Sequence, residues 1–468
     1  MNNRNVDVAV IGAGSAGMRA LRAARAWTHN VVMIEGGAYG TTCASVGCMP
    51  SKLLIAAAES AHAAHQAPEF GVNTGAVDID GVAVMNRVRR ERDRFVSFVV
   101  DTVERLPEEQ RIRGMAHFLD DNRIQVGDHT IVRAKRIVIA TGSSPTYPGF
   151  FAELGDRLVV NDDIFEWRDL PKSVAVFGPG VIGLELGQAL SRLGVDVLMF
   201  GLGGQVGPLT DPKVMESAKQ VFSAEFYLDA DAKVHSMVRA GDGVSIEFDD
   251  HGGKKRAATV DYVIAATGRA PNVSALGLEN TSLPLDEKGV PVFDADTLRI
   301  GQSSVFIAGD VNNDRPLLHE AADEGTIAGD NAGRYPDVKP GARSSPLSIV
   351  FSDPQIAMVG STYSELSQRD VVVGTVSFAD QGRSRVMLKN QGLLRVYADP
   401  ANGQFLGAEM FGPRAEHLGH LLAWAHQSNM TIGQMLEMPF YHPVIEEGLR
   451  TALRNVHKQL RKPMLRAA

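Results

Sequence analysis

Cysteine is scarce in this sequence: only two of its 468 residues are Cys. Two thiols cannot form the disulfide framework of a secreted scaffold, so we predict a cytoplasmic protein. The sequence also lacks a run of about 18 apolar residues, the length that crosses a bilayer, and we expect no membrane partner. An excess of basic residues is missing too. The 47 Lys and Arg against 55 Asp and Glu give a net charge of −8, which argues against a nucleic-acid partner.

Glycine is plentiful, with 47 residues, and part of it is patterned. An apolar run at 6–11, typical of a strand buried on both faces, leads into a glycine-rich turn and an alanine-rich helical stretch. In that turn Gly12, Gly14 and Gly17 match the G-x-G-x-x-G fingerprint of a dinucleotide site, where a helix N-terminus faces the pyrophosphate. Glu35, at the end of the next apolar run, stands where a carboxylate accepts ribose hydroxyl hydrogen bonds.

The same pattern returns after a second apolar run at 173–177. Here Gly178, Gly180 and Gly183 form the fingerprint, and Gly201 stands where the first copy has its acid. One fingerprint is weak evidence, but two copies, each between a strand and a helix, favour two dinucleotide sites. The alternative is a pair of glycine turns in doubly wound sheets that bind no cofactor.

Three further apolar runs end in short turns that contain glycine: Thr141-Gly142, Thr267-Gly268 and Gly309-Asp310. Strand ends of this kind return the chain to the nucleotide site of an open α/β sheet. From about residue 345, short alternating strands precede helices, which is typical of an α+β domain. We therefore predict an α/β protein with two Rossmann-like dinucleotide-binding domains and a C-terminal α+β domain.

Cys43 and Cys48 lie five positions apart. In a regular helix their Cα atoms would be roughly 8–9 Å apart, whereas a disulfide needs about 4.4–6.8 Å. If they pair, the helix is distorted there, which Gly47 and Pro50 allow. So small a loop gives a structural disulfide on the order of 2 kcal/mol, so a reversible redox pair suits the spacing better. Two inert buried thiols and a metal site are the alternatives; no His or third Cys lies close in sequence to complete a metal site.

Together these motifs resemble the flavin-dependent pyridine nucleotide–disulfide oxidoreductases over essentially the whole chain, and most of all the dihydrolipoamide dehydrogenases. Cys43 and Cys48, followed by Pro50-Ser51-Lys52, resemble the redox-active C-x4-C-x-P-S-K of that family. His442-Pro443 with Glu447 resembles its catalytic H-P-x-x-x-E, although Val444 replaces the usual threonine. Further elements that resemble the family are Gly114-Met115-Ala116, the A-T-G segments at 140–142 and 266–268, Ala308-Gly309-Asp310 with Leu318 downstream, and Asp353-Pro354 through Gly360.

The resemblance implies two cofactor sites. We expect no metal, because no His or third Cys lies close in sequence to Cys43 and Cys48. The implied FAD site consists of Gly12, Gly14, Gly17, Glu35, Thr42, Lys52, Ala116, Thr141, Gly142, Asp310 and Leu318. The implied site for the nicotinamide dinucleotide consists of Gly178, Gly180, Gly183, Glu185 and Gly268. Within this arrangement, Lys52 would pair with Glu185 near the junction of the two cofactors.

The catalytic residues that the resemblance implies are Cys43, Cys48, His442 and Glu447. Cys43 would be the thiol that exchanges with substrate, and Cys48 the thiolate nearest the flavin. His442 would be the acid–base catalyst, oriented by Glu447. Because this histidine would serve the active site of the other subunit, the family pattern implies a homodimer.

The family also implies four segments along the chain. They are the first part of an FAD-binding domain (1–150), an NAD(P)-binding domain (151–270), the second part of the FAD-binding domain (271–343) and a dimerisation domain (344–468). The implied reaction oxidises a dihydrolipoyl group, on a small molecule or a lipoyl domain, with NAD as acceptor.

The loop at Gly201 leaves the choice of nucleotide less clear-cut. NAD-preferring members usually carry an acid at this position, and NADP-preferring members have arginines nearby. This loop has neither, and we favour NAD while admitting NADP. The alternative functions are a glutathione reductase-like disulfide reductase that uses NAD(P)H, and, from another class, a flavoprotein with a binding role only.

Overall fold

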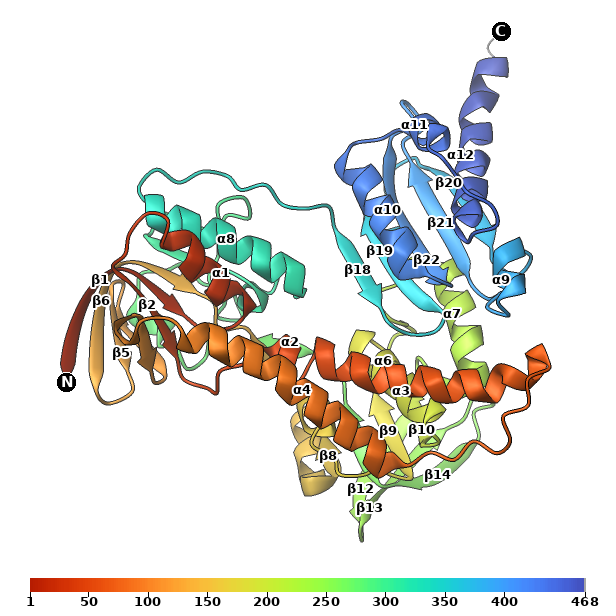
Figure 1. Cartoon of the computed structure of the whole chain (residues 1–468), viewed down its shortest axis with the longest axis horizontal. Helices are drawn as coiled ribbons and strands as arrows, with labels where there is room; N and C mark the ends of the chain where they lie inside the picture. The colour runs from red at the N-terminus through yellow and green to blue at the C-terminus, as the bar shows by residue number, and fades with distance from the viewer. Residues whose placement is uncertain (467–468) are drawn as a thin grey trace. The chain divides into compact units, whose positions relative to one another are not determined.

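The structure, a computed structural model, describes residues 1–466, with side chains up to residue 461 (Figure 1). The chain forms two compact units, each with its own sheets and hydrophobic clusters. The first unit contains residues 1–53, 87–146 and 268–344, and the second contains 54–86, 147–267 and the residues from 345 onward. The division of the chain into four segments stays a prediction.

A mostly parallel sheet forms the frame of the first unit. Both faces of its central strand are buried, with Val10 paired to Met33 on one side and to Val138 on the other. This burial explains the apolar run at 6–11. The strand order is β3 (Arg111–Arg113), β2 (Val31–Glu35), β1 (Asn2–Ile11) and β6 (Thr130–Ile139), after which β6 pairs with β17 (Val305–Ile307) and with the antiparallel β5 (Arg123–Val126) and β4 (Ala116–Asp120).

The helices α1 (Ser15–Ala24) and α8 (Leu318–Arg334) pack closely in this unit. A Cβ atom on Gly325 would lie 2.2 Å from the Ala16 carbonyl oxygen, so only glycine permits this approach of the backbones. The unit also contains α2 (Thr42–Ser45), the start of α3 (Cys48–Gln66), most of α4 (Gly81–Glu104) and the two-stranded sheet of β7 (Ser143–Pro145) and β16 (Arg269–Pro271).

The second unit contains another parallel sheet, which packs against an antiparallel three-stranded sheet. The parallel strands are β11 (Tyr227–Asp229), β10 (Asp196–Phe200), β9 (Ser173–Phe177), β15 (Tyr262–Ala265) and β8 (Leu158–Val159), with helices α5 (Asn161–Ile164), α6 (Val181–Arg192) and α7 (Pro212–Glu225). The antiparallel strands are β12 (Val234–Ala240), β13 (Gly243–Asp249) and β14 (Lys255–Val260). Each unit thus has a Rossmann-like sheet, as predicted.

The C-terminal part of the second unit is an antiparallel sheet with helices, which confirms the predicted α+β domain. Its strand order is β18 (Leu347–Val350), β19 (Gln355–Gly360), β22 (Phe405–Gly412), β21 (Leu393–Ala398) and β20 (Val372–Ser377). The helices are α9 (Gly382–Val386), α10 (Ala415–Gln427), α11 (Ile432–Glu437) and α12 (Glu446–Arg466).

A buried polar network joins the two parts of the second unit. Asp211, fully buried, caps α7 by accepting the Lys213 N–H at 2.9 Å. Arg395 on β21 donates to both oxygens of this carboxylate, at 2.7 and 2.6 Å, and Tyr397 donates at 3.0 Å. Glu409 on β22, also fully buried, accepts the Asp211 N–H at 2.8 Å. These hydrogen bonds satisfy charges that burial would otherwise make costly.

A second network surrounds Asp353, which precedes β19. Its carboxylate accepts from Arg192 on α6 at 2.8 Å and from Lys389 at 2.6 Å. Arg192 also donates to Glu225 on α7 at 2.5 Å. Burial works to raise the pKa of Asp353, but the charges of Lys389 and Arg192 outweigh it and hold the pKa below its usual value.

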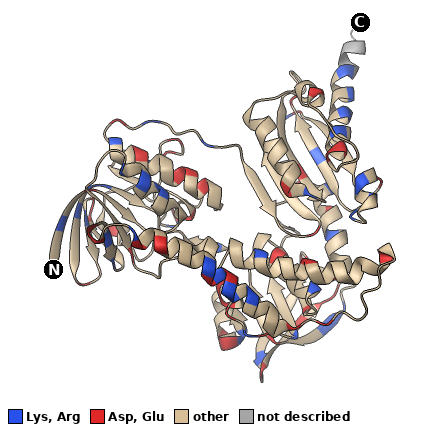
Figure 2. Cartoon of the chain, in the orientation of Figure 1, with Lys and Arg blue, Asp and Glu red and all other residues tan. Residues whose placement is uncertain are grey.

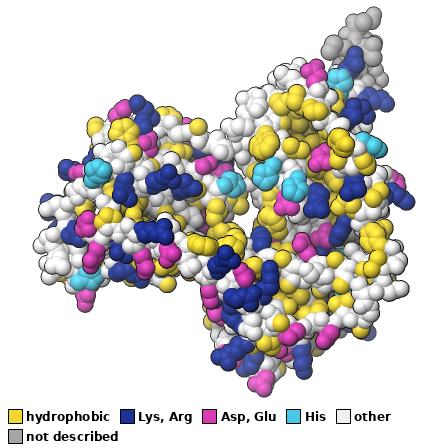
Figure 3. All heavy atoms as spheres, viewed as in Figure 1, with side chains coloured by type: hydrophobic (Ala, Val, Ile, Leu, Met, Phe, Trp, Pro, Cys, Tyr) yellow, Lys and Arg dark blue, Asp and Glu magenta, His cyan; other side chains and the backbone are white. Residues whose placement is uncertain are grey.

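Charged side chains lie mainly on helices and loops, and the sheet strands carry few (Figure 2). In the space-filling view, basic and acidic side chains are mixed over the visible face of each unit (Figure 3). Among the described residues, no helix is long and apolar enough to span a membrane.

Candidate active site

The first glycine turn, between β1 and α1, has the geometry that its fingerprint predicts. Gly12 has a φ of +110°, and a Cβ atom there would lie 2.2 Å from the Ala140 carbonyl oxygen. A Cβ atom on Gly17 would lie 1.9 Å from the Gly12 carbonyl oxygen, whereas Gly14 faces open space. The first turn of α1 has no side-chain cap. Its N–H groups and positive dipole end are therefore available to a phosphate.

Glu35 stands beside this turn at the end of β2. Its carboxylate accepts the Ala13 N–H at 2.7 Å through one oxygen and the Gly37 N–H at 2.7 Å through the other. Each oxygen keeps a further lone pair, so the group can still accept a ribose hydroxyl. An open glycine turn, an uncapped helix and an adjacent carboxylate are the donor and acceptor set that fits the adenosine and pyrophosphate of FAD.

The loop that carries Asp310 is held by hydrogen bonds at both ends. Ser143 Oγ donates to Asp310 Oδ2 at 2.9 Å, and Arg269 Nε donates to Ser143 Oγ at 2.9 Å. On the other side, Glu324 Oε2 accepts the Gly309 N–H and the Asn312 side-chain amide, both at 2.7 Å. Asp310 is thus fixed by partners that the sequence did not predict.

Glu324 is the least expected of these partners, because it is a fully buried carboxylate on α8. Burial raises its pKa, against the Gly309 hydrogen bond and the charge of Arg343, whose Nη2 donates to Glu324 Oε1 at 2.7 Å. In the sequence, the indication that Glu324 is buried is its position directly before Gly325 in an alanine- and glycine-rich helix.

The two A-T-G segments, 140–142 and 266–268, are held by different hydrogen bonds. Thr141 Oγ1 donates to the Asn272 carbonyl oxygen at 2.8 Å, and the Asn272 side chain donates to the Thr141 carbonyl oxygen at 2.9 Å. Gly142, with a φ of +69°, accepts the Asn272 N–H at 2.9 Å. Gly268, which the sequence predicted for the nicotinamide site, belongs to the first unit, where its carbonyl accepts the Thr146 N–H at 3.0 Å.

Cys43 and Cys48 lie on either side of a break in the helix. Cys43 is on the short α2, which ends at Ser45, and Cys48 begins α3. A Cβ atom on Gly47 would lie 3.0 Å from the Thr42 carbonyl oxygen, so a side chain there would crowd the break. The distortion expected for a paired i, i+5 spacing is therefore present.

The two cysteine side chains are hydrogen-bonded to each other. This bond and burial raise the pKa of the Cys43 thiol, while the nearby Lys52 ammonium acts in the opposite direction. Lys52 Nζ also lies 3.3 Å from Ser51 Oγ. The contact between the two sulfurs therefore disfavours the thiolate form of Cys43.

His442 and Glu447 form the second predicted catalytic pair. His442 Nδ1 lies 3.1 Å from both carboxylate oxygens of Glu447, and the Val444 N–H donates to one of them at 3.3 Å. The hydrogen bonds from His442 and Val444 lower the pKa of Glu447. Because a carboxylate only accepts, Nδ1 carries the proton and Nε2 of the neutral ring is an acceptor. The His442 side chain is 80% exposed, so Nε2 is accessible.

The second glycine turn, between β9 and α6, repeats the geometry of the first. Gly178 has a φ of +105°, with a Cβ atom there only 2.3 Å from the Ala266 carbonyl oxygen. A Cβ atom on Gly183 would lie 2.0 Å from the Gly178 carbonyl oxygen, and Gly180 faces open space. The start of α6 again has no side-chain cap, so it too can accept a pyrophosphate.

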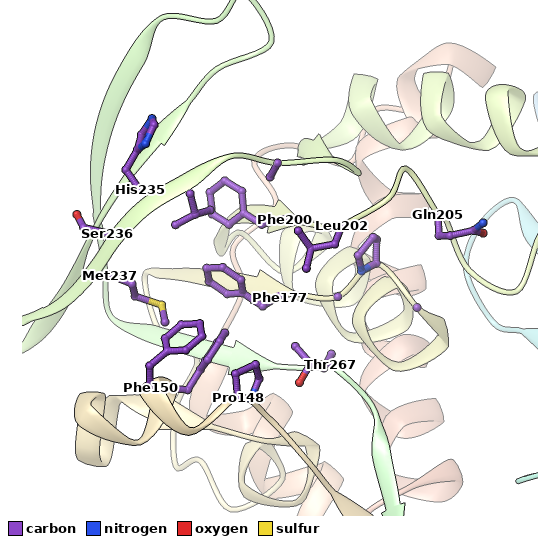
Figure 4. Close-up of a pocket in the computed structure, with 18 of the residues that line it drawn as sticks. Pro148, Phe150, Phe177, Phe200, Leu202, Gln205, His235, Ser236, Met237 and Thr267 are labelled. Carbon is purple, nitrogen blue, oxygen red and sulfur yellow. The ribbon is translucent and has the colours of Figure 1, made fainter. Parts of the chain in front are cut away.

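A cavity of about 650 Å³ opens beside this second turn, over the carboxyl ends of β9, β10 and β15 (Figure 4). Ligands of open α/β sheets bind at this edge. Glu185, predicted for the same site, is buried on α6 and accepts the Phe351 N–H at 2.9 Å.

The predicted site residues divide between the two units. The FAD set and both cysteines belong to the first unit, while Gly178, Gly180, Gly183, Glu185, His442 and Glu447 belong to the second. The pairing of Lys52 with Glu185 joins residues of different units and stays a prediction. Among the described residues, no group of three or more His, Cys, Asp or Glu side chains is arranged to hold a metal ion.

Comparisons with known proteins agree with this geometry. Residues 6–325 match the family described as pyridine nucleotide-disulphide oxidoreductase, and residues 347–453 match the dimerisation domain of that family. A dihydrolipoyl dehydrogenase of Haloferax volcanii is 30% identical, over 96% of this chain and 96% of that protein. A mercuric reductase of Bacillus cereus is 28% identical, over 98% of this chain and 73% of that protein.

A solved structure shares the fold. The HOCl-induced flavoprotein disulfide reductase RclA from Escherichia coli aligns with a TM-score of 0.81 and 20% sequence identity, covering 96% of this chain and 99% of that one. The chain therefore belongs to the pyridine nucleotide-disulphide oxidoreductase family, whose cofactors are FAD and NAD(P).

Proposed function

We propose that the protein oxidises a dihydrolipoyl group to the lipoyl disulfide, with FAD as bound cofactor and NAD as final acceptor. The observation that carries this proposal is the hydrogen-bonded pair of Cys43 and Cys48 at the break between α2 and α3. These are the only cysteines of the sequence. A thiol pair held in contact in this way needs only a small movement to form a disulfide.

In the proposed reaction, a substrate thiolate attacks Cys43 Sγ of the oxidised pair. The Cys43–Cys48 bond breaks, a mixed disulfide forms, and Cys48 leaves as a thiolate. The second substrate thiol gives its proton to His442 and attacks the substrate sulfur of the mixed disulfide. The substrate disulfide forms, and Cys43 leaves as a thiolate that takes up one of the two substrate protons. The substrate thereby loses two electrons and two protons. FAD, when bound between the residues named below, would supply the two-electron acceptor and the hydride chemistry that NAD requires.

The raised pKa of Cys43 supports this division of roles. Contact with Cys48 and burial disfavour the thiolate form of Cys43 in the reduced pair, which is consistent with the proposed assignment of the thiolate to Cys48. The ammonium of Lys52, one turn further along α3, is placed to stabilise that charge.

His442 is the proposed proton acceptor for the substrate thiols. An imidazole can accept a thiol proton and return it near neutral pH. Glu447 holds the ring with Nε2 free to accept and stabilises the imidazolium that forms. By the family pattern this histidine acts on the pair of the partner subunit.

A homodimer is therefore part of the proposal. Residues 347–453 match the family's dimerisation domain, and α10 exposes Leu421 (42%) and Trp424 (66%). Figure 3 shows hydrophobic side chains gathered on the visible face of this C-terminal part. We also propose a cytoplasmic location, because a reversible thiol pair works in a reducing compartment.

The proposed cofactor contacts are those of the two glycine turns and their surroundings. For FAD they are Gly12, Gly14, Gly17, Glu35, Thr42, Lys52, Ala116, Thr141, Gly142, Asp310 and Leu318. For the nicotinamide dinucleotide they are Gly178, Gly180, Gly183, Glu185 and Gly268.

A steady-state comparison tests the function. The FAD-loaded protein is assayed with dihydrolipoamide and NAD, and in the opposite direction with lipoamide or glutathione disulfide and NADH or NADPH. We expect the highest kcat/KM for the lipoyl pair. A higher value for glutathione disulfide would replace the proposal with a glutathione reductase-like activity, and a purified protein without flavin would favour a binding role.

A further inference from the structure

The cavity of the second unit has an unusual lining for a dinucleotide site. Phe177 and Phe200 lie side by side within it, with ring centroids 5.3 Å apart (Figure 4). Phe150 and Met237 face them from other segments, and Leu202 stands at the edge with 83% of its surface exposed. Aromatic rings stack on adenine whatever sugar it carries.

Among the described residues that line this cavity, none is Asp, Glu, Lys or Arg. The one titratable side chain among them is His235, whose Nε2 lies 2.7 Å from Asp249 Oδ1. Asp231, which follows β11, accepts the Gly203 N–H at 2.8 Å and lines a neighbouring cavity together with Lys219. The feature that usually distinguishes NAD from NADP, an acid or an arginine at the ribose, is thus absent from this lining.

Gly201 explains why no acid stands at the usual position. A Cβ atom there would lie 2.6 Å from the Ala230 carbonyl oxygen and 2.7 Å from Cγ of Pro179. Pro179 lies between the first two glycines of the second fingerprint, so the glycine turn itself fills the space that a side chain at 201 requires. With this backbone, a carboxylate cannot be carried at the end of β10.

We propose that this site binds NAD and NADP with similar affinity. It contacts adenine through apolar side chains, and its lining has no Asp, Glu, Lys or Arg that would distinguish the 2′-hydroxyl of the NAD ribose from the 2′-phosphate of NADP. Pro179 and the Ala230 carbonyl exclude a side chain at position 201. The inference deepens the proposed function and rests on it only in taking this cavity as the nicotinamide dinucleotide site.

Binding measurements test the proposal without turnover. The FAD-loaded protein is titrated calorimetrically with NAD, NADP, 5′-ADP and 2′,5′-ADP. One charge-assisted hydrogen bond changes affinity about 10- to 150-fold. Because the site lacks such a bond to the 2′ position, we expect the dissociation constants of NAD and NADP to differ by less than about tenfold, and those of 5′-ADP and 2′,5′-ADP likewise. A larger ratio in either direction overturns the proposal.

Leu202→Arg supplies the missing charge at an exposed position that needs no repacking. It should tighten binding of NADP and 2′,5′-ADP by at least about tenfold and leave NAD and 5′-ADP nearly unchanged. Leu202→Gln is the matched uncharged control and should alter neither ratio. An unchanged ratio in Leu202→Arg would show that the 2′ position lies elsewhere and would contradict the proposal.

Phe150→Ala tests the apolar contact. Phe150 is 61% exposed, so its replacement leaves the fold intact, and we expect the same loss of affinity for all four ligands. Unequal losses, or no loss, would overturn the recognition by stacking. Failure of the protein to turn over dihydrolipoamide while these titrations succeed would contradict the proposed function and leave this inference standing.

Discussion

The ring of His442 lies with Nδ1 3.1 Å from each carboxylate oxygen of Glu447, which presents the opposite nitrogen to solvent. If this pair moves the substrate protons, His442→Gln should lower kcat by about 10²- to 10⁴-fold. The side chain is exposed, so the melting temperature and flavin content should not change. Stopped-flow and steady-state assays check this, with His457→Gln, a half-buried histidine on α12, as control. A variant with normal kcat would remove His442 from the reaction.

Cys48→Ser should abolish oxidation of dihydrolipoamide, with a loss of more than about 10³-fold, because no internal disulfide can form. Cys43→Ser should do the same. Both variants should retain FAD, since neither changes a glycine turn. Thiol titration of the wild-type protein should detect two thiols after reduction and none after oxidation, whereas retention of activity in either variant would refute the redox pair.

The features of the site that could be predicted from the sequence are those that depend on local backbone conformation. A fingerprint glycine is required by contacts between the turn and the adjacent strand, as at Gly12 and Gly178. The cysteine spacing likewise predicts a break in the helix if the two residues pair, because five positions of regular helix separate their Cα atoms by more than a disulfide allows. The buried strands at 6–11 and 173–177 were predictable for the same reason, since both faces must be apolar.

The supports of the site were not predictable, because they come from distant parts of the fold. Arg269 reaches Ser143 across 126 positions, and Arg395 reaches Asp211 across 184. The sequence shows only a charged residue in each case, and on average such a residue lies on the surface. The reason for a glycine at position 201 was not predictable either, because the Pro179 ring and the Ala230 carbonyl that exclude a side chain come close to it only in the folded protein.

Glu324→Ala should weaken FAD binding at least about tenfold. Without this carboxylate the Gly309 N–H and the Asn312 amide lose their acceptor, so the loop carrying Asp310 is no longer fixed. The same two unpaired groups should lower the free energy of unfolding by about 2–4 kcal/mol. Fluorescence of released FAD and urea titration measure the two effects. Asp323→Asn, an adjacent substitution on α8, is the control, and equal flavin affinity in both variants would contradict this role.

Arg395→Met should lower the free energy of unfolding by about 3–5 kcal/mol, because it leaves the buried Asp211 carboxylate without its cation. Adding Asp211→Asn should recover part of that loss, since the unpaired charge is then removed as well. Urea titration of the two single variants and the double variant gives the coupling energy. Strictly additive losses would mean that the ion pair does not contribute as a unit.

Asp353→Asn should lower the free energy of unfolding by about 1–3 kcal/mol at pH 7, because Lys389 and Arg192 lose their common acceptor.

The pKa of the Asp353 carboxyl is lower in the folded protein than its usual value of 3.8. A lowered pKa means that the unfolded state binds the proton more readily, so the contribution is complete above the unfolded pKa and disappears as pH falls through the folded one. The difference between wild type and variant should therefore stay constant from pH 7 to pH 5 and shrink below about pH 4. Urea titrations across this range check the sign, and a difference that grew on acidification would contradict it.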